Sequence, residues 1–312
     1  MQLVIIVLGN ITAILTVMLS RGQQQSITSN PLILSLAVSD LLVGFAALYN
    51  FTVIDESLHD NKYPCLLRFV LLCGSCLTSF YNIVAIAVDR YIAILYPLKY
   101  QLYMTEGVIS AMVIVIWSAA WMVSTVPFYW NTYDPKCECW LHAVVPRYYV
   151  MLVLGPIFLV VWLAITTLYW RIWKEARAYT RRKLTISTST GQQCTPNYGK
   201  SNRVVLTILG CFSICWLPLM IGMLLQSFHV NLSITVHRAM YWAALCNSSA
   251  NPIIYTWKNS TYRKTFCRLL RLEVRPGEER KQNEPTKRTT LQEPRTISTV
   301  LQVEVVGHNA AS

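Results

Sequence analysis

The feature that most restricts the fold of this chain is a series of seven apolar blocks. A helix rises about 1.5 Å per residue, so about 20 apolar residues cross the hydrocarbon core of a membrane. The blocks are Met1–Leu19, Pro31–Ile54, Leu66–Tyr96, Val108–Phe128, Tyr148–Trp170, Val204–Leu225 and Val236–Tyr255. Each block is continuously apolar and does not alternate, which indicates helices and not the strands of a barrel. The sequence therefore predicts an all-α membrane protein, a bundle of seven transmembrane helices.

The composition agrees with a chain that has lipid as its solvent. Of the 312 residues, 54% are hydrophobic and 13% are charged, whereas a soluble domain carries about 25% charged residues. No internal repeat is visible, which argues against a two-fold transporter. No Ser/His or paired-Asp arrangement falls at membrane depth in the sequence, as an intramembrane hydrolase would require. We therefore expect no enzymatic activity, and a membrane transporter or channel is the alternative from a different class.

The basic residues predict the orientation of the spans. If the N-terminus faces outside, the cytoplasmic segments between Arg21 and Arg271 hold 16 Lys and Arg residues and the outer segments hold five. Positive charge is retained on the cytoplasmic side, so we expect a multi-pass plasma-membrane protein with its N-terminus outside. The formal net charge of +12 suits the anionic lipid bilayer and an acidic partner. Nucleic acid is not expected as a partner, because no soluble basic domain is present.

The two ends of the chain differ from its apolar centre. The first span begins at Met1 without a charged region before it, and Arg21 follows it, so we expect a truncated start and not a secretory signal. Residues 273–312 are rich in Glu, Arg, Pro, Thr and Gln, which predicts a disordered cytoplasmic tail after a receptor-sized domain of residues 1–272.

A short amphipathic segment lies between the last span and this tail. Tyr262, Phe266, Leu269 and Leu270 recur at i, i+4, i+7 and i+8, which predicts a helix on the membrane surface. Cys267 in this segment is either a palmitoylation site or a free thiol.

Six spans contain a polar or proline motif. Polar groups in lipid are costly, so each is a functional hypothesis. In chain order they are Gly9-Asn10, Asp40 within Leu36-Ala-Val-Ser-Asp-Leu-Leu, Asp89-Arg90-Tyr91, Trp117, Cys215-Trp216-Leu217-Pro218 and Asn251-Pro252-Ile253-Ile254-Tyr255. Together they resemble the rhodopsin-like (class A) G-protein-coupled receptors from Met1 to about Arg271. The resemblance implies a receptor that transduces a small extracellular ligand signal to a heterotrimeric G protein, with arrestin and receptor kinases acting on the tail.

The resemblance also implies residues for activation. They are Asp89, Arg90, Tyr91, Tyr169, Trp216, Pro218, Asn251, Pro252 and Tyr255. Asp89 would hold Arg90 at rest and release it to the G protein when the sixth helix moves, and the two prolines would act as hinges. Many relatives add an acidic residue where Tyr198 stands, so we expect a weak resting lock. The alternative is that Asp89 and Arg90 form only an interfacial ion pair.

A second implied site is a possible allosteric sodium ion, with no other cofactor expected. Its ligands would be Asp40, Ser79, Asn247, Ser248 and Asn251. A set of interhelical hydrogen bonds without an ion is the alternative.

Three cysteines fall in outer segments, namely Cys65, Cys137 and Cys139. An oxidising environment favours one disulfide with one thiol left over. The loop from Cys139 through Val144-Val145-Pro146 resembles that of adenosine receptors, which favours Cys139 over Cys137 as the partner of Cys65. The same alignment puts Val161 where most relatives have a proline in the fifth span. Because Pro156 lies elsewhere, we expect any kink nearer the outside.

The residues expected to line the ligand pocket are mostly apolar. Amine receptors need a carboxylate where this chain has Leu72, an opsin needs a lysine in the seventh span, and the adenosine-binding positions hold Met223, Leu245, Leu141 and His142. The expected lining is Leu72, Cys73, Cys76, Leu141, His142, Trp216, Leu219, Met220, Met223, Tyr241 and Leu245. We therefore expect a weakly polar or lipid-like ligand. The alternative to this ligand class is an amine- or adenosine-type receptor with a divergent pocket. The alternative to the pocket itself is that several of these residues simply face lipid or neighbouring helices.

Overall fold

The computed structural model describes residues 1–20, 30–52, 61–135, 139, 144–190 and 198–258. All regular secondary structure in these ranges is helical. The long helices are α1 (Gln2–Ser20), α2 (Asn30–Thr52), α3 (Lys62–Leu95), α5 (Glu106–Ser124), α9 (Gly155–Thr190), α10 (Tyr198–Ser227) and α11 (Ile234–Lys258). The short ones are the 3-10 turn η2 (Pro97–Lys99), α4 (Tyr100–Tyr103), α6 (Val126–Tyr129), α8 (Arg147–Tyr149) and the π-helical turn η3 (Val150–Leu154). They lie within the unit Met1–Leu272.

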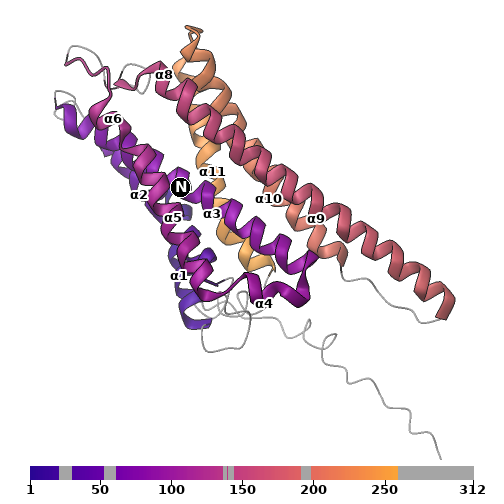
Figure 1. Cartoon of the computed structure of the whole chain (residues 1–312). Coiled ribbons are helices and arrows are strands. Elements are labelled where there is room, and N and C mark those ends of the chain that lie inside the picture. The colour runs from indigo at the N-terminus through magenta and orange to yellow at the C-terminus, as the bar shows by residue number, and fades with distance from the viewer. Residues whose placement is uncertain (21–29, 53–60, 136–138, 140–143, 191–197, 259–312) are drawn as a thin grey trace, which may run out of the picture. The chain divides into compact units, whose positions relative to one another are not determined.

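The long helices pack around α3. Helix α3 contacts α2, α5 and α9, while α10 packs between α9 and α11. Helix α11 also contacts α1 and α2, which closes the ring (Figure 1). Residues far apart in sequence on α2, α3, α10 and α11 are therefore brought together inside the bundle.

Six of the long helices are long and apolar enough to cross a membrane among the residues described; α11 is the exception. The reason is its polar residues, since Asn247, Ser248 and Asn251 reduce its hydropathy and are nevertheless buried. They face the interior of the bundle, where Ser248 and Asn251 form hydrogen bonds with Asp40. By contrast, large apolar side chains such as Ile114 on α5 and Ile214 on α10 are 66% and 76% exposed, as lipid-facing residues should be.

The fifth span is irregular at its first turns and not at its centre. The turn η3 ends where the Gly155 amide donates to the Val150 carbonyl, five residues earlier, just before Pro156. Proline lacks an amide hydrogen and disturbs the preceding turn, and a π-helical turn absorbs such a disturbance. Val161 lies in continuous helix. The irregularity is therefore displaced towards the start of the span, where the sequence places Pro156.

Two other helices contain a proline in their interior, Pro218 in α10 and Pro252 in α11.

Several predictions lie outside the described residues: the surface helix with Cys267, the tail, and the pocket residues Leu141 and His142. The backbone of Tyr198 and Tyr255 is described, but their side chains are not.

Candidate functional site

The deepest polar cluster is centred on Asp40 of α2, which is fully buried. Its Oδ1 accepts hydrogen bonds from the hydroxyls of Ser79 on α3 and Ser248 on α11, each at 2.8 Å. Its Oδ2 accepts a hydrogen bond from Nδ2 of Asn251 at 2.6 Å. One carboxylate thus joins three helices. Asn10 of α1 adds a fourth helix, because its Nδ2 donates to the Ser248 carbonyl at 3.2 Å.

The donor set of this cluster fits a sodium ion. Carboxylate, hydroxyl and amide oxygens are what a hard cation binds. Among the described residues no Lys or Arg lies within ion-pair distance of Asp40, so the buried carboxylate has no protein counter-charge there. The structure brings Asp40, Ser79, Ser248 and Asn251 into contact, as the family resemblance implied. Asn247 is buried but stands apart from these hydrogen bonds, since its Nδ2 has no hydrogen-bond partner in the described part of the chain.

An aromatic cluster occupies the centre of the bundle. The Phe80 ring of α3 lies edge-on to Trp216 and Phe212 of α10, with centroids 4.5 Å and 5.2 Å apart. Phe158 of α9 completes the cluster, 6.1 Å from Phe80 and 6.0 Å from Phe212. Trp216 lies two residues before Pro218. A change in the position of Trp216 would therefore act on the part of α10 that the proline weakens.

The residues expected to line the ligand pocket gather in one part of the core. Cys76, Trp216, Leu219, Met220 and Leu245 belong to the central buried cluster. Leu72, Cys73, Met223 and Tyr241 are partly buried and pack against it. These residues come from α3, α10 and α11, and nearly all of them present carbon or sulfur. A ligand held among them would gain chiefly from apolar burial.

At the far end of α3, Asp89 is buried and pairs with Arg90 at 2.8 Å, while the Arg90 side chain is 45% exposed. The Tyr100 hydroxyl of α4 donates to Oδ1 of Asp89 at 2.6 Å. Nearby, Arg171 of α9 donates to the Tyr91 hydroxyl at 3.5 Å, and Tyr169 is buried. A half-exposed arginine held by a fixed carboxylate is placed to change partners when another surface docks.

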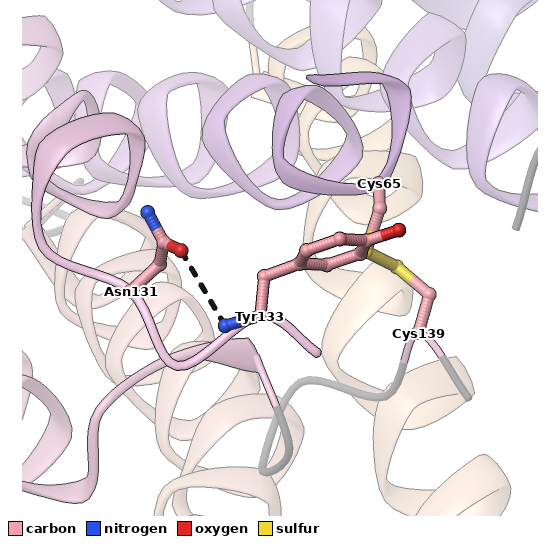
Figure 2. The surroundings of a disulfide bond; sticks show 4 residues. All are labelled: Cys65, Asn131, Tyr133 and Cys139. Carbon is pink, nitrogen blue, oxygen red and sulfur yellow. Dashed lines mark hydrogen bonds between the residues drawn. A yellow bond between two sulfur atoms is a disulfide. The ribbon is translucent and has the colours of Figure 1, made fainter. Parts of the chain in front are cut away.

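At the opposite end of α3, a disulfide joins Cys65 to Cys139, with their Cα atoms 6.0 Å apart (Figure 2). Both cysteines are buried in a second apolar cluster with Val144, Val145 and Tyr149. Tyr133 packs against the same cluster, and its backbone amide donates to Oδ1 of Asn131 at 3.4 Å. Cys139 is thereby held against the first turns of α3.

Some residues of these sites could not be predicted from the sequence. Tyr100 follows the third span in a short helix, and no pattern connects it to Asp89. Phe80, Phe158 and Phe212 resemble any other apolar residue of a span. Arg68 stood among the outer charges, yet in the structure it is only 7% exposed. Burial of a charged residue depends on which helices pack against it, which the local sequence does not report.

Comparison with known proteins decides the family. The family model of the 7 transmembrane receptor (rhodopsin family) matches residues 9–255. The chain belongs to this family. The family and the fold class predicted from the sequence, a seven-transmembrane bundle, are thereby confirmed. Membership also makes the chain a multi-pass membrane protein.

Individual rhodopsin-family receptors resemble the chain at moderate identity. The alpha-1A adrenergic receptor of Mus musculus is 27% identical over 309 residues, covering 86% of this chain and 65% of that receptor. The 5-hydroxytryptamine receptor 6 of Rattus norvegicus is 29% identical, covering 81% and 66%. The human histamine H2 receptor is 27% identical, covering 94% and 85%. The chain thus spans about two thirds of the length of the adrenergic and serotonin relatives.

Proposed function

We propose that this protein is a receptor that binds a small extracellular ligand and activates a heterotrimeric G protein. The single observation that carries the proposal is the family match over residues 9–255. The two ends of α3 add support. One end is fixed by the disulfide at Cys65 and lies next to an apolar cluster, and the other presents the half-exposed Arg90. We propose no catalytic role.

The proposed mechanism couples these ends through the aromatic cluster and the hinges. A ligand packed against Met220 and Leu245 would press on Trp216, which touches Phe80. Movement of α10 about Pro218 would then open the end of the bundle where Arg90 lies. Arg90 would exchange the Asp89 carboxylate for groups of the G protein. A ligand shifts this equilibrium only by as much as it prefers the open state.

Asp40, Ser79, Ser248 and Asn251 would hold an allosteric sodium ion, with Asn247 as the neighbouring residue of the implied set. A bound sodium ion would supply the positive charge that the buried Asp40 lacks. Because these residues come from α2, α3 and α11, the site would favour the arrangement in which the three helices stay together.

For the ligand we propose a weakly polar or lipid-like molecule. Leu72 offers no carboxylate to an ammonium group, and the buried carboxylates in the described ranges are Asp40 and Asp89. Asp40 already accepts three hydrogen bonds and Asp89 pairs with Arg90. An unpaired ammonium in this core would cost several kcal/mol.

The second candidate is an amine-type receptor with a divergent pocket. It is favoured by the names of the relatives, which include adrenergic, 5-hydroxytryptamine and histamine receptors. An adenosine-type receptor is supported by the sequence motifs that resemble adenosine receptors, namely the loop around Cys139 and the stretches at residues 87–94, 126–131 and 169–177. We also propose that the protein lies in the plasma membrane with its N-terminus outside. Residues 1–272 would form the receptor domain, and residues 273–312 would form a tail that arrestin and receptor kinases recognise. Palmitoylation of Cys267 is part of the same proposal.

The proposal is tested by guanine-nucleotide exchange on heterotrimeric G proteins in membranes that contain the full chain. Libraries of lipids, amines and nucleosides are added in separate arms. The expected result is ligand-dependent exchange in at least one arm, which is lost with Arg90→Ala. Transport of solutes or ions by the same membranes, without any exchange, would favour the transporter or channel.

A further inference from the structure

Arg68 is a buried cation whose partner is missing from the described structure. It lies on α3 and is 7% exposed. Its Nε and Nη1 are shielded from solvent and have no hydrogen-bond partner among the residues described. Its guanidinium carbon lies 4.7 Å from the centre of the Phe69 ring. A buried guanidinium without an anion is costly, because neither water nor a carboxylate compensates for its charge.

The position of Arg68 relates it to the expected ligand pocket. Arg68, Leu72 and Cys76 follow one another at i, i+4 and i+8, so they lie on one face of α3. Arg68 is one turn nearer the disulfide than Leu72. The guanidinium therefore stands at the outer end of the same face that carries the apolar lining.

A second unsatisfied group lies on α11. Tyr241 of α11 is close enough to interact electrostatically with Arg68, as is Tyr49 of α2. The Tyr241 hydroxyl is shielded from solvent and lacks a hydrogen-bond partner within the described ranges. Four residues further along α11, Leu245 belongs to the central apolar cluster. Among the residues described, helices α3 and α11 thus each carry a polar donor without a hydrogen-bond partner, Arg68 and Tyr241, one turn away from apolar residues.

From this arrangement we propose that Arg68 and Tyr241 bind the anionic headgroup of an amphiphilic ligand, a carboxylate or a phosphate, whose apolar chain packs towards Met220 and Leu245. The guanidinium and the hydroxyl are hydrogen-bond donors that match carboxylate and phosphate oxygens. The apolar residues below them suit a hydrocarbon chain. The inference rests on the proposed receptor function and narrows the ligand class to anionic amphiphiles.

Direct binding tests this inference without any G protein. The full chain is placed in phosphatidylcholine nanodiscs, and stabilisation against thermal unfolding is titrated with five probes. Oleate and oleoyl lysophosphatidate carry the two headgroups, oleyl alcohol carries the chain without the charge, and acetate and inorganic phosphate carry the charge without the chain. Comparison of oleate with oleoyl lysophosphatidate distinguishes the two anionic headgroups.

Three variants accompany the wild type. Arg68→Gln removes the charge, Tyr241→Phe removes only the hydroxyl, and Arg238→Gln is the control, because Arg238 is an exposed arginine on the same helix as Tyr241. We expect at least one oleoyl anion to bind the wild type. Arg68→Gln should weaken that binding by about tenfold to a hundredfold and Tyr241→Phe by a smaller factor, since hydrogen bonds to charged groups are the stronger ones. Arg238→Gln should bind as the wild type does.

Four outcomes would overturn the inference. They are equal binding of oleyl alcohol and the oleoyl anions, unchanged binding in a folded Arg68→Gln protein, saturation by acetate or phosphate alone, and no binding by any probe. Tyr241→Phe keeps the test valid if Arg68→Gln does not fold. Nucleotide exchange is measured separately, so binding without exchange contradicts the receptor proposal alone, and exchange without anion binding contradicts this inference alone.

Discussion

At the scale of single residues, the buried carboxylate of Asp40 has a structural role and, in our proposal, a regulatory one. Three side chains from α3 and α11 donate to it, and a hydrogen bond to a charged group contributes about 1.5–3 kcal/mol. Removing the charge therefore loosens the contact of α2 with both helices. It also removes the one negative charge that the proposed sodium ion would need.

We predict that sodium stabilises the wild type and not Asp40→Asn. A ligand that binds only the folded state raises stability as its concentration rises above its dissociation constant. The wild-type melting temperature should be a few degrees higher in sodium chloride than in choline chloride at equal ionic strength. Ser39→Ala is a control, because within the described residues the Ser39 hydroxyl donates to the Leu36 carbonyl of its own helix and not to Asp40. If Asp40→Asn responds to sodium as the wild type does, the ion site is elsewhere or absent.

The disulfide gives a second prediction at this scale. Peptide mapping by mass spectrometry under non-reducing conditions should yield Cys65 linked to Cys139, with Cys137 as a free thiol. Cys139→Ser should lower the stability of the protein by about 2–5 kcal/mol, since the bond closes a long loop. Cys137→Ser is the matched control and should change little. Recovery of a Cys65–Cys137 peptide from the wild type would refute this pairing.

At the scale of elements, hydropathy predicts where helices cross the membrane and not where they end. The block Pro31–Ile54 corresponds closely to α2, which the structure describes over Asn30–Thr52. The block Tyr148–Trp170 is followed by a helix that continues to Thr190. Lys, Arg and Ala favour helix in water as well as in lipid, so a helix can leave the membrane without any change in its backbone. Its apolar boundary then marks only the lipid surface.

The position of a polar residue within a span explains which site residues could be predicted from the sequence. Asp40, Asn251 and Arg90 stand out because polar residues in apolar spans need a reason. Arg68 and Tyr100 lie near span ends, where charged and polar residues are common. Only the folded bundle shows that Arg68 is buried, and only the position of α4 brings Tyr100 to Asp89.

Helix α10 begins at Tyr198, the position where an acidic residue would help to hold Arg90. We predict that Tyr198→Glu lowers basal nucleotide exchange by about twofold to fivefold, the effect of one partly exposed ion pair. Tyr198→Gln serves as the control for size and polarity. Both variants are compared with the wild type at matched surface expression. Equal basal exchange in all three proteins would show that Arg90 needs no partner on α10.

At the scale of the whole molecule, the proposed ligand class depends on the apolar core. We predict that neither a simple biogenic amine nor adenosine activates the protein at submicromolar concentration, because Leu72 and Met223 lack the groups that would pair with them. Leu72→Asp should instead raise the affinity for amines, since it supplies the missing carboxylate. The readout is nucleotide exchange in cells that express the chain. Asp134 and Glu138 are acidic residues shortly before Cys139 in the outer segment. Submicromolar activation of the wild type by an amine, lost on mutation of either residue but not of Leu72, would reverse this prediction.

The central claim is that the end of the bundle with Arg90 activates a heterotrimeric G protein. Its most direct test is guanine-nucleotide exchange on a panel of G proteins, in membranes containing the wild type or Arg90→Ala, with and without an oleoyl anion that binds the wild type. We predict exchange above that of membranes without the protein, an increase with the anion, and a loss of about tenfold or more in Arg90→Ala. Binding of the anion to Arg90→Ala should persist, because Arg90 lies at the opposite end of α3 from Arg68. Exchange no higher than in membranes without the protein, for every G protein tested, would contradict the account.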